Sequence, residues 1–205
     1  MMKTSLLTLL LCSCAATVSL STVAHVVNTS NPPSDVEGNL AMKGVDNKTN
    51  TDMTIAIEVV QLQDSQGLIY VGGIVDAAKL TPYLSLMATR LPDDFSSYRN
   101  NQKLRDHGKF HMTLINPYEY KEVDTKNIAI GEVINISLLG LGHVAKGKQE
   151  TYFVVVDSSV AQAKRRQLGL ADKDFHITLG FNPNDIYGVS KGVERLIKPS
   201  DIENK

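Results

Sequence analysis

A six-residue pattern occurs twice in this chain and constrains the fold more than any other feature of the sequence. Residues 109–114 read KFHMTL and residues 174–179 read DFHITL. Both copies contain an aromatic residue, His, an apolar residue, Thr and Leu, and the two histidines are 176 − 111 = 65 residues apart. With ordinary residue usage, such a pair arises by chance about once in a few thousand sequences. The repeat therefore predicts two equivalent halves.

Alternation within each copy predicts a β-strand with one apolar and one polar face. Side chains on a strand point to opposite faces in turn, so His111 shares a face with Thr113, and His176 shares a face with Thr178. We expect these four side chains to converge on one open cleft and the other faces to be buried under helices. The expected apolar faces consist of Phe110, Met112 and Leu114 in the first copy, and Phe175, Ile177, Leu179 and Phe181 in the second.

The segments around the two motifs repeat the order strand, strand, helix, motif strand. Asp76 is suited to cap the first helix, and Asp157 or Ser158 the second, because short polar side chains accept hydrogen bonds from a helix N-terminus. The order predicts an α+β domain with two pseudo-symmetric lobes. In the first half we expect strands at 53–61 and 67–75, a helix at 76–91, a polar loop at 93–108 and a motif strand at 109–115; in the second, strands at 128–141 and 151–156 joined through 142–147, a helix to about 170 and a motif strand at 172–181.

The N-terminus is typical of an export signal. Lys3 is followed by an apolar run at residues 6–11 and by small residues. Cleavage after Ala24 fits a small-residue site, and the alternative is a lipoprotein-type site that would leave a lipid anchor on Cys14. A buried N-terminal helix is the competing interpretation. The apolar run is too short to span a bilayer, which needs about 20 apolar residues.

Composition divides the chain into three parts and limits the kinds of metal site, disulfide and nucleic-acid surface that it can form. We expect a signal peptide at 1–24, a flexible linker at 25–52 that is rich in Asn, Ser, Pro and Gly, and a folded domain at 53–200. Both cysteines lie in the leader, so the mature chain has neither a disulfide nor a cysteine cluster for structural zinc. With a net charge of −1, no overall basic field points to bulk nucleic acid as a partner. A nucleotide or a short RNA end remains compatible with it.

Two imidazoles and two hydroxyls on one surface suit phosphoryl chemistry. Imidazole titrates near neutral pH, so one histidine can accept a proton while the other donates one. Threonine hydroxyls can donate hydrogen bonds to phosphate oxygens where negative charge develops. A two-histidine metal site is the weaker alternative, because only Asp174 lies near His176 as a further ligand. We expect no metal and no other cofactor.

The paired H-x-T motifs resemble the two-histidine (2H) phosphoesterase superfamily, which includes RNA 2′,3′-cyclic phosphodiesterases and 2′,5′-RNA ligase-like enzymes. The stretches DKDFHITLGF and GVSKG, within residues 169–192, look closest to Swiss-army-knife RNA-repair-like 2H domains. The resemblance covers about residues 53–197. It implies antiparallel sheets facing a central cleft and metal-independent cleavage of cyclic or 2′-linked phosphodiesters at a nucleotide or RNA end. The export leader departs from the intracellular members.

The resemblance also implies roles for individual residues. His111 would act as the base and His176 as the acid, while Thr113 and Thr178 would hold the phosphoryl oxygens. A monomeric, periplasmic or secreted 2′,3′-cyclic phosphodiesterase is the interpretation that we favour. The alternatives are a non-catalytic nucleotide binder and an exported interaction protein of the same fold.

Several further side chains are weaker candidates for contact with the substrate. Tyr118 and Phe181 are expected to stack against a base of the substrate. Lys109 shares a strand face with His111 and could add positive charge there. The basic run at 164–166 is expected to be a solvated helix face.

Overall fold

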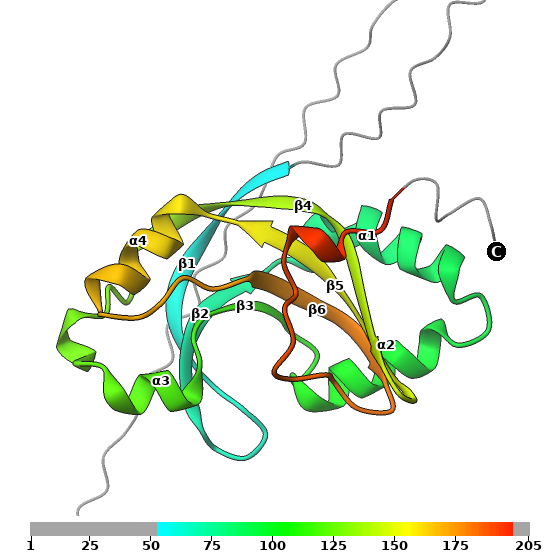
Figure 1. Ribbon diagram of the computed structural model, residues 1–205, viewed down its shortest axis with the longest axis horizontal. Helices are drawn as coiled ribbons and strands as arrows, with labels where there is room; N and C mark the ends of the chain where they lie inside the picture. Colours follow the sequence, from blue (N-terminus) through cyan, green and yellow to red (C-terminus); the bar gives the residue numbers. More distant parts are fainter. Residues whose placement is uncertain (1–52, 199–205) are drawn as a thin grey trace, which may run out of the picture. The chain divides into compact units, whose positions relative to one another are not determined.

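Six antiparallel strands close into one barrel in the computed structural model, which describes residues 53–198 (Figure 1). Their order around the barrel is β1-β2-β3-β6-β5-β4, so each half of the chain supplies three neighbouring strands. The α+β class and the two equivalent halves are confirmed. The signal peptide, the linker and Cys14 lie outside the described residues. The strands are β1 Met53–Gln63, β2 Ile69–Val75, β3 Phe110–Ile115, β4 Val133–Lys146, β5 Gln149–Asp157 and β6 Phe175–Asn182.

The two halves share one continuous sheet because β1 and β4 are long. The second part of β1, residues 59–63, pairs with β2, while its first part, residues 53–58, pairs with β4. On β4, residues 133–138 pair with β1 and residues 137–146 pair with β5. The two antiparallel sheets implied by the resemblance are therefore joined at this seam. They meet again between β3 and β6.

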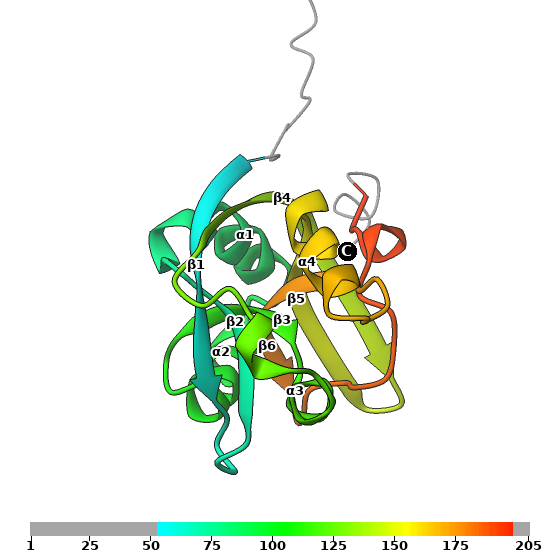
Figure 2. The same cartoon turned by 90° about the vertical axis from the view of Figure 1, so that its left-hand side faces the viewer.

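Helices lie at both ends of the barrel. The helices α1 and α2 lie at one end, whereas α3 and α4 lie at the other (Figures 1 and 2). Asp76 caps α1 through a 2.9 Å hydrogen bond from the Ala78 N–H, and Ser158 caps α4 through a 3.2 Å bond from the Ala161 N–H, as the sequence predicts. The helices are α1 Ala77–Arg90, α2 Phe95–Arg105, α3 Pro117–Glu122 and α4 Ser159–Gln167, with short 3-10 turns at Thr125–Asn127 and Val193–Arg195.

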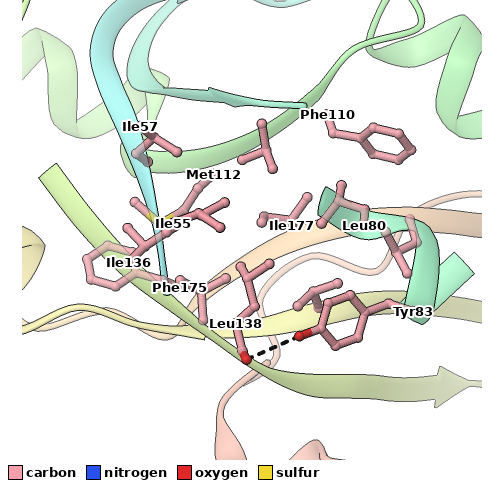
Figure 3. Close-up of a cluster of buried hydrophobic side chains, with 14 of the residues drawn as sticks. Ile55, Ile57, Leu80, Tyr83, Phe110, Met112, Ile136, Leu138, Phe175 and Ile177 are labelled. Carbon is pink, nitrogen blue, oxygen red and sulfur yellow. Dashed lines mark hydrogen bonds between the residues drawn. The ribbon is translucent and has the colours of Figure 1, made fainter. Parts of the chain in front are cut away.

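The apolar faces of both motif strands lie in the hydrophobic core, as predicted. Met112 and Ile177 are fully buried at its centre (Figure 3). Helix α1 covers this core with Leu80, Tyr83 and Met87, and the Tyr83 hydroxyl donates a 3.2 Å hydrogen bond to the Leu138 carbonyl. The other buried apolar residues of the two motifs are Phe110, Leu114, Phe175 and Leu179.

Three segments differ from the sequence expectation. The strand expected at 128–141 begins only at Val133. The predicted polar loop at 93–108 contains α2, which buries Arg99 and Gln102. Apolar periodicity misses such a helix, since Tyr98 is the only apolar residue among its three buried ones. Arg99 and Gln102 donate hydrogen bonds to the backbone carbonyls of Leu179 and Lys109. The expected connection at 142–147 is mostly strand, because β4 runs through Lys146 and only the hairpin turn at Gly147 and Lys148 interrupts the pairing with β5.

Candidate active site

The two motifs lie on neighbouring strands, although they are far apart in the sequence. Strands β3 and β6 pair antiparallel at Met112 and Ile177. Counting outward from this pair places His111 opposite Thr178 and Thr113 opposite His176. The two histidines are then diagonal neighbours, whose Cα atoms are roughly 7–8 Å apart in such a pair. This spacing leaves room for one phosphate group between the two imidazoles.

The four motif side chains point away from the hydrophobic core. Met112 and Ile177, which alternate with them, are fully buried. His111, Thr113 and His176 are partly exposed, whereas Thr178 is 8% exposed. The structure thus brings the predicted residues together on one face, and Thr178 is the least accessible of them. A separate cavity of about 380 Å³ between β1, β2 and α1 contains no motif residue, so we assign no chemistry to it.

Tyr70 from β2 and the C-terminus of α2 surround His111. The Tyr70 and His111 ring centroids are 5.3 Å apart. Burial lowers the His111 pKa below its ordinary value, and Arg105 acts in the same direction. The carboxylates of Asp106 and Asp185 oppose this effect. The nearby charges therefore include two that favour the protonated imidazole and one that disfavours it.

His176 lies in a more strongly cationic environment. Its ring packs edge-on against Phe153, with ring centroids 5.7 Å apart. Its Nδ1 is 3.2 Å from the Asp174 carbonyl oxygen, which can only accept, so Nδ1 carries the proton and Nε2 is left as the acceptor. Burial lowers the His176 pKa to about 3, and the ammonium groups of Lys191 and Lys173 contribute to the decrease. At neutral pH this imidazole is uncharged.

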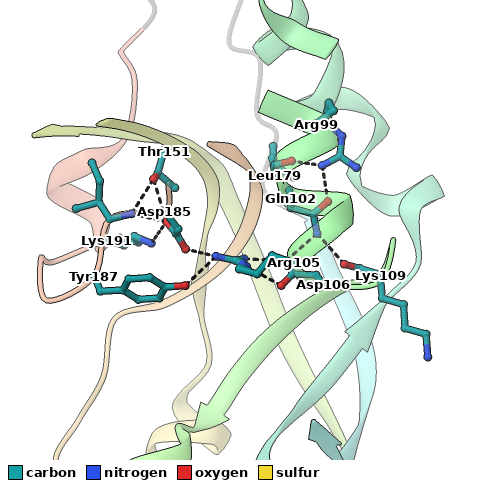
Figure 4. A network of polar contacts seen from close by, with 11 residues as sticks. Arg99, Gln102, Arg105, Asp106, Lys109, Thr151, Leu179, Asp185, Tyr187 and Lys191 are labelled. Carbon is teal, nitrogen blue, oxygen red and sulfur yellow. Dashed lines mark hydrogen bonds and ion pairs between the residues drawn. The ribbon is translucent and has the colours of Figure 1, made fainter. Parts of the chain in front are cut away.

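A buried polar network adjoins the motif face (Figure 4). Asp185 Oδ1 accepts hydrogen bonds from Thr151 Oγ1 at 2.9 Å and from Lys191 Nζ at 3.0 Å, and Oδ2 pairs with Arg105. Arg105 also pairs with Asp106 at 2.7 Å. Sequence reasoning missed this network because Asp185 and Lys191 lie in an irregular loop after β6, where no periodicity marks them.

The two proposed stacking residues have different surroundings. Phe181 is 5% exposed, and the Arg105 guanidinium covers its ring at 4.8 Å from the centroid. A register shift between β5 and β6 leaves Leu179 without a partner, so Phe181 leaves the apolar face on which alternation placed it. Tyr118 is 73% exposed on α3. Base stacking by these two side chains stays a prediction.

Two buried arginines hold the motif strands in an equivalent way, and neither was identified from the sequence. Arg99 of α2 donates to the carbonyl of Leu179, and Arg165 of α4 donates to the carbonyl of Leu114 at 2.6 Å. Each acceptor is the residue directly after the motif threonine. The expected solvated face at 164–166 is therefore wrong for Arg165, which is 2% exposed because helical geometry turns one residue of three inward. The sequence does contain a signal for this pair of arginines. Arg99 precedes His111 by 12 residues and Arg165 precedes His176 by 11, so the two occupy similar positions relative to the motifs.

Comparisons with known proteins identify the family of this chain. Among residues 53–198, no group of three or more His, Cys, Asp or Glu side chains could hold a metal ion, and no helix is long and apolar enough to cross a membrane. No curated protein and no solved structure matches the chain. Residues 81–187, just over half of the chain and including both motifs, match the Swiss Army Knife 2H phosphoesterase domain. The chain therefore belongs to the 2H phosphoesterases of the Swiss Army Knife family.

Proposed function

We propose that the chain is a metal-independent phosphodiesterase that hydrolyses a cyclic or 2′-linked phosphodiester at the end of a nucleotide or short RNA. The observation that carries this proposal is the pairing of Met112 with Ile177, because it places both H-x-T motifs on one face. Two imidazoles and two hydroxyls can then surround a single phosphate. Membership of the 2H phosphoesterases supports the same reaction class.

The charges around the histidines favour His176 as the base and His111 as the acid. His176 is kept neutral beside two lysines, and its Nε2 is free to accept a proton. His111 lies near two carboxylates that favour its protonated form. We therefore assign the order opposite to the one implied by the resemblance.

The reaction then needs only water and the two imidazoles. His176 takes a proton from water as the water oxygen bonds to phosphorus. The bond between phosphorus and one ribose oxygen breaks, and His111 donates its proton to that oxygen. The hydroxyls of Thr113 and Thr178 donate hydrogen bonds to the non-bridging oxygens, where negative charge increases. The product is a phosphate monoester, and both imidazoles have exchanged protonation states.

Turnover of a 2′,3′-cyclic nucleotide in the presence of EDTA tests this proposal. We expect hydrolysis at an unchanged rate when the chelator is added. Binding without turnover would instead support a nucleotide-binding protein of the same fold. A requirement for added divalent metal would show that the two-histidine mechanism is wrong.

Replacing either motif threonine with alanine is expected to reduce kcat/KM less than replacing a histidine. Loss of a hydrogen bond to a charged oxygen corresponds to about 1.5–3 kcal/mol, or roughly 10- to 150-fold in kcat/KM. Thr113→Ser and Thr178→Ser keep the hydroxyl and should retain most activity. Steady-state kinetics of the four variants gives the comparison. Equal loss in the serine and alanine variants of one site would contradict the role of its hydroxyl.

We also propose that the protein acts outside the cytoplasm, since its N-terminus carries the features of an export signal. The expected result is mature protein in the periplasm or medium that begins near Cys14 or His25. N-terminal sequencing of the fractionated protein measures this directly. Lys3→Glu in the leader should reduce export without changing the folded domain. Full-length protein beginning at Met1 in the cytosol would contradict the proposal.

A further inference from the structure

Lys191 carries a buried ammonium group beside the second motif. The residue lies in the loop after β6 and is 4% exposed. Its Nζ is 3.0 Å from Asp185 Oδ1 and 5.7 Å from the centroid of the Phe153 ring. A buried cation is costly unless it is paired, and here its partner Asp185 also pairs with Arg105. The arrangement therefore fixes a positive charge at one place near the motif face.

Phe153 connects this charge to His176. The His176 ring packs edge-on against Phe153, and Phe153 is the β5 partner of Thr178. Lys191 and His176 therefore pack against the same aromatic ring. A positive charge in the same surroundings disfavours a second positive charge on the imidazole, and Lys191 lowers the His176 pKa in this way.

The other groups that face His176 do not cancel this effect. The carboxylate of Asp185 favours the charged imidazole, but it is shared between Lys191 and Arg105. Lys173 acts in the same direction as Lys191, although more weakly. The Asp174 backbone carbonyl accepts from Nδ1, while its carboxylate accepts a 2.6 Å hydrogen bond from Ser190. After burial, Lys191 is the strongest influence on the His176 pKa.

We propose that Lys191 is a positioning residue, whose ammonium group keeps the His176 imidazole neutral in the free protein so that Nε2 can accept a proton from water. This role rests on the phosphodiesterase function proposed above. Lys191 lies beyond residues 81–187, which match the family, and the resemblance of the GVSKG stretch that contains it gives this lysine no role. Asp185 holds the ammonium in place, and Arg105 holds Asp185 from α2.

An NMR titration of the histidine ring signals tests the proposal on the free protein. The His176 signal is identified by its loss in His176→Ala. In the parent, with a His176 pKa of about 3, the ring should stay neutral down to about pH 4. In Lys191→Met and Lys191→Gln, the midpoint should rise by about one to three pH units, as expected when a neighbouring charge is removed.

Two further variants serve as controls. Lys191→Arg keeps the charge and should leave His176 neutral over the same range. Lys148→Met removes an exposed lysine in the β4–β5 turn and should have no effect. The neutral variants should fold, because Asp185 keeps Thr151, the Ile186 N–H and Arg105 as partners. If Lys191→Met does not fold, Lys191→Gln decides the result, since glutamine can still bond to Asp185.

An unchanged His176 midpoint in a folded neutral variant would overturn the role of Lys191. The titration needs no substrate, so its outcome is independent of catalysis. A raised midpoint without hydrolysis of any phosphodiester by the parent would overturn the phosphodiesterase function and leave the electrostatic effect intact. In an active protein, kcat/KM of Lys191→Met should begin to fall at a higher pH on acidification than kcat/KM of the parent.

Discussion

Replacing His176 with alanine is expected to lower kcat by roughly 10²- to 10⁴-fold, which is the usual contribution of a positioned acid or base. The same loss is expected for His111→Ala. Because both imidazoles act on one phosphate, the double variant should be little worse than the worse single variant. Initial rates with a 2′,3′-cyclic nucleotide provide the measurement. Near-full activity in His176→Ala would refute the assignment.

A variant at a histidine outside the motifs distinguishes the loss of a catalytic group from the effect of replacing any histidine. His107 is exposed and adopts a left-handed backbone conformation, with a φ of 53°. Asparagine tolerates this conformation better than most residues, so His107→Asn should keep the fold and the activity. Equal losses in His107→Asn and His176→Ala would point to an effect unrelated to the motif.

The pH dependence of this activity follows from the same two histidines. The free protein must have His176 neutral and His111 protonated, and both pKa values lie below the ordinary histidine value. Raising the pH through the His111 pKa removes the acid, whereas His176 loses its base form only near pH 3. The optimum of kcat/KM should therefore lie on the acidic side of neutrality, with a bell shape.

Replacing Arg165 with methionine is expected to lower the free energy of unfolding by about 3–5 kcal/mol, as when one partner of a buried ion pair is removed. The guanidinium donates to the carbonyls of Leu114 and Ala171 and pairs with Glu119 at 2.8 Å. Methionine fills similar space, but it leaves these acceptors without their donor. Urea unfolding followed by circular dichroism measures the change.

The adjacent arginine supplies the control for this substitution. The side chain of Arg166 is 59% exposed, and it pairs with Asp172 at 3.2 Å on the surface. An exposed pair contributes less than about 1 kcal/mol, so Arg166→Met should leave the unfolding midpoint almost unchanged. Equal destabilisation by the two substitutions would show that Arg165 does not support the first motif strand.

The sequence predicted those parts of the fold that depend on apolar patterning. The alternation around His111 and His176 gave the motif strands and their buried faces, and the apolar spacing after Asp76 gave α1. The repeated order of elements predicted two equivalent halves. The neighbouring positions of the two motifs followed from this pseudo-symmetry, because equivalent strands can pair about a twofold axis.

The remaining features depend on polar contacts between segments distant in sequence. Helix α2 was missed because two of its three buried residues, Arg99 and Gln102, are polar, and buried polar side chains need hydrogen-bond partners. Those partners include the backbone carbonyls of Leu179 and Lys109, which no apolar pattern reveals. The proximity of Lys191 to His176 was missed for the same reason, since it depends on the path of the loop after β6.

The long strand β1 makes the order of synthesis matter for folding. Its first part pairs with β4, so that Met53 is the partner of Leu138, which lies 138 − 53 = 85 residues later in the chain. During synthesis this strand edge has no partner until β4, the first strand of the second half, has emerged. Contacts of such sequence separation slow folding and leave unpaired strands open to association with other chains. Residues 53–58 therefore stay open to such association until β4 has been made.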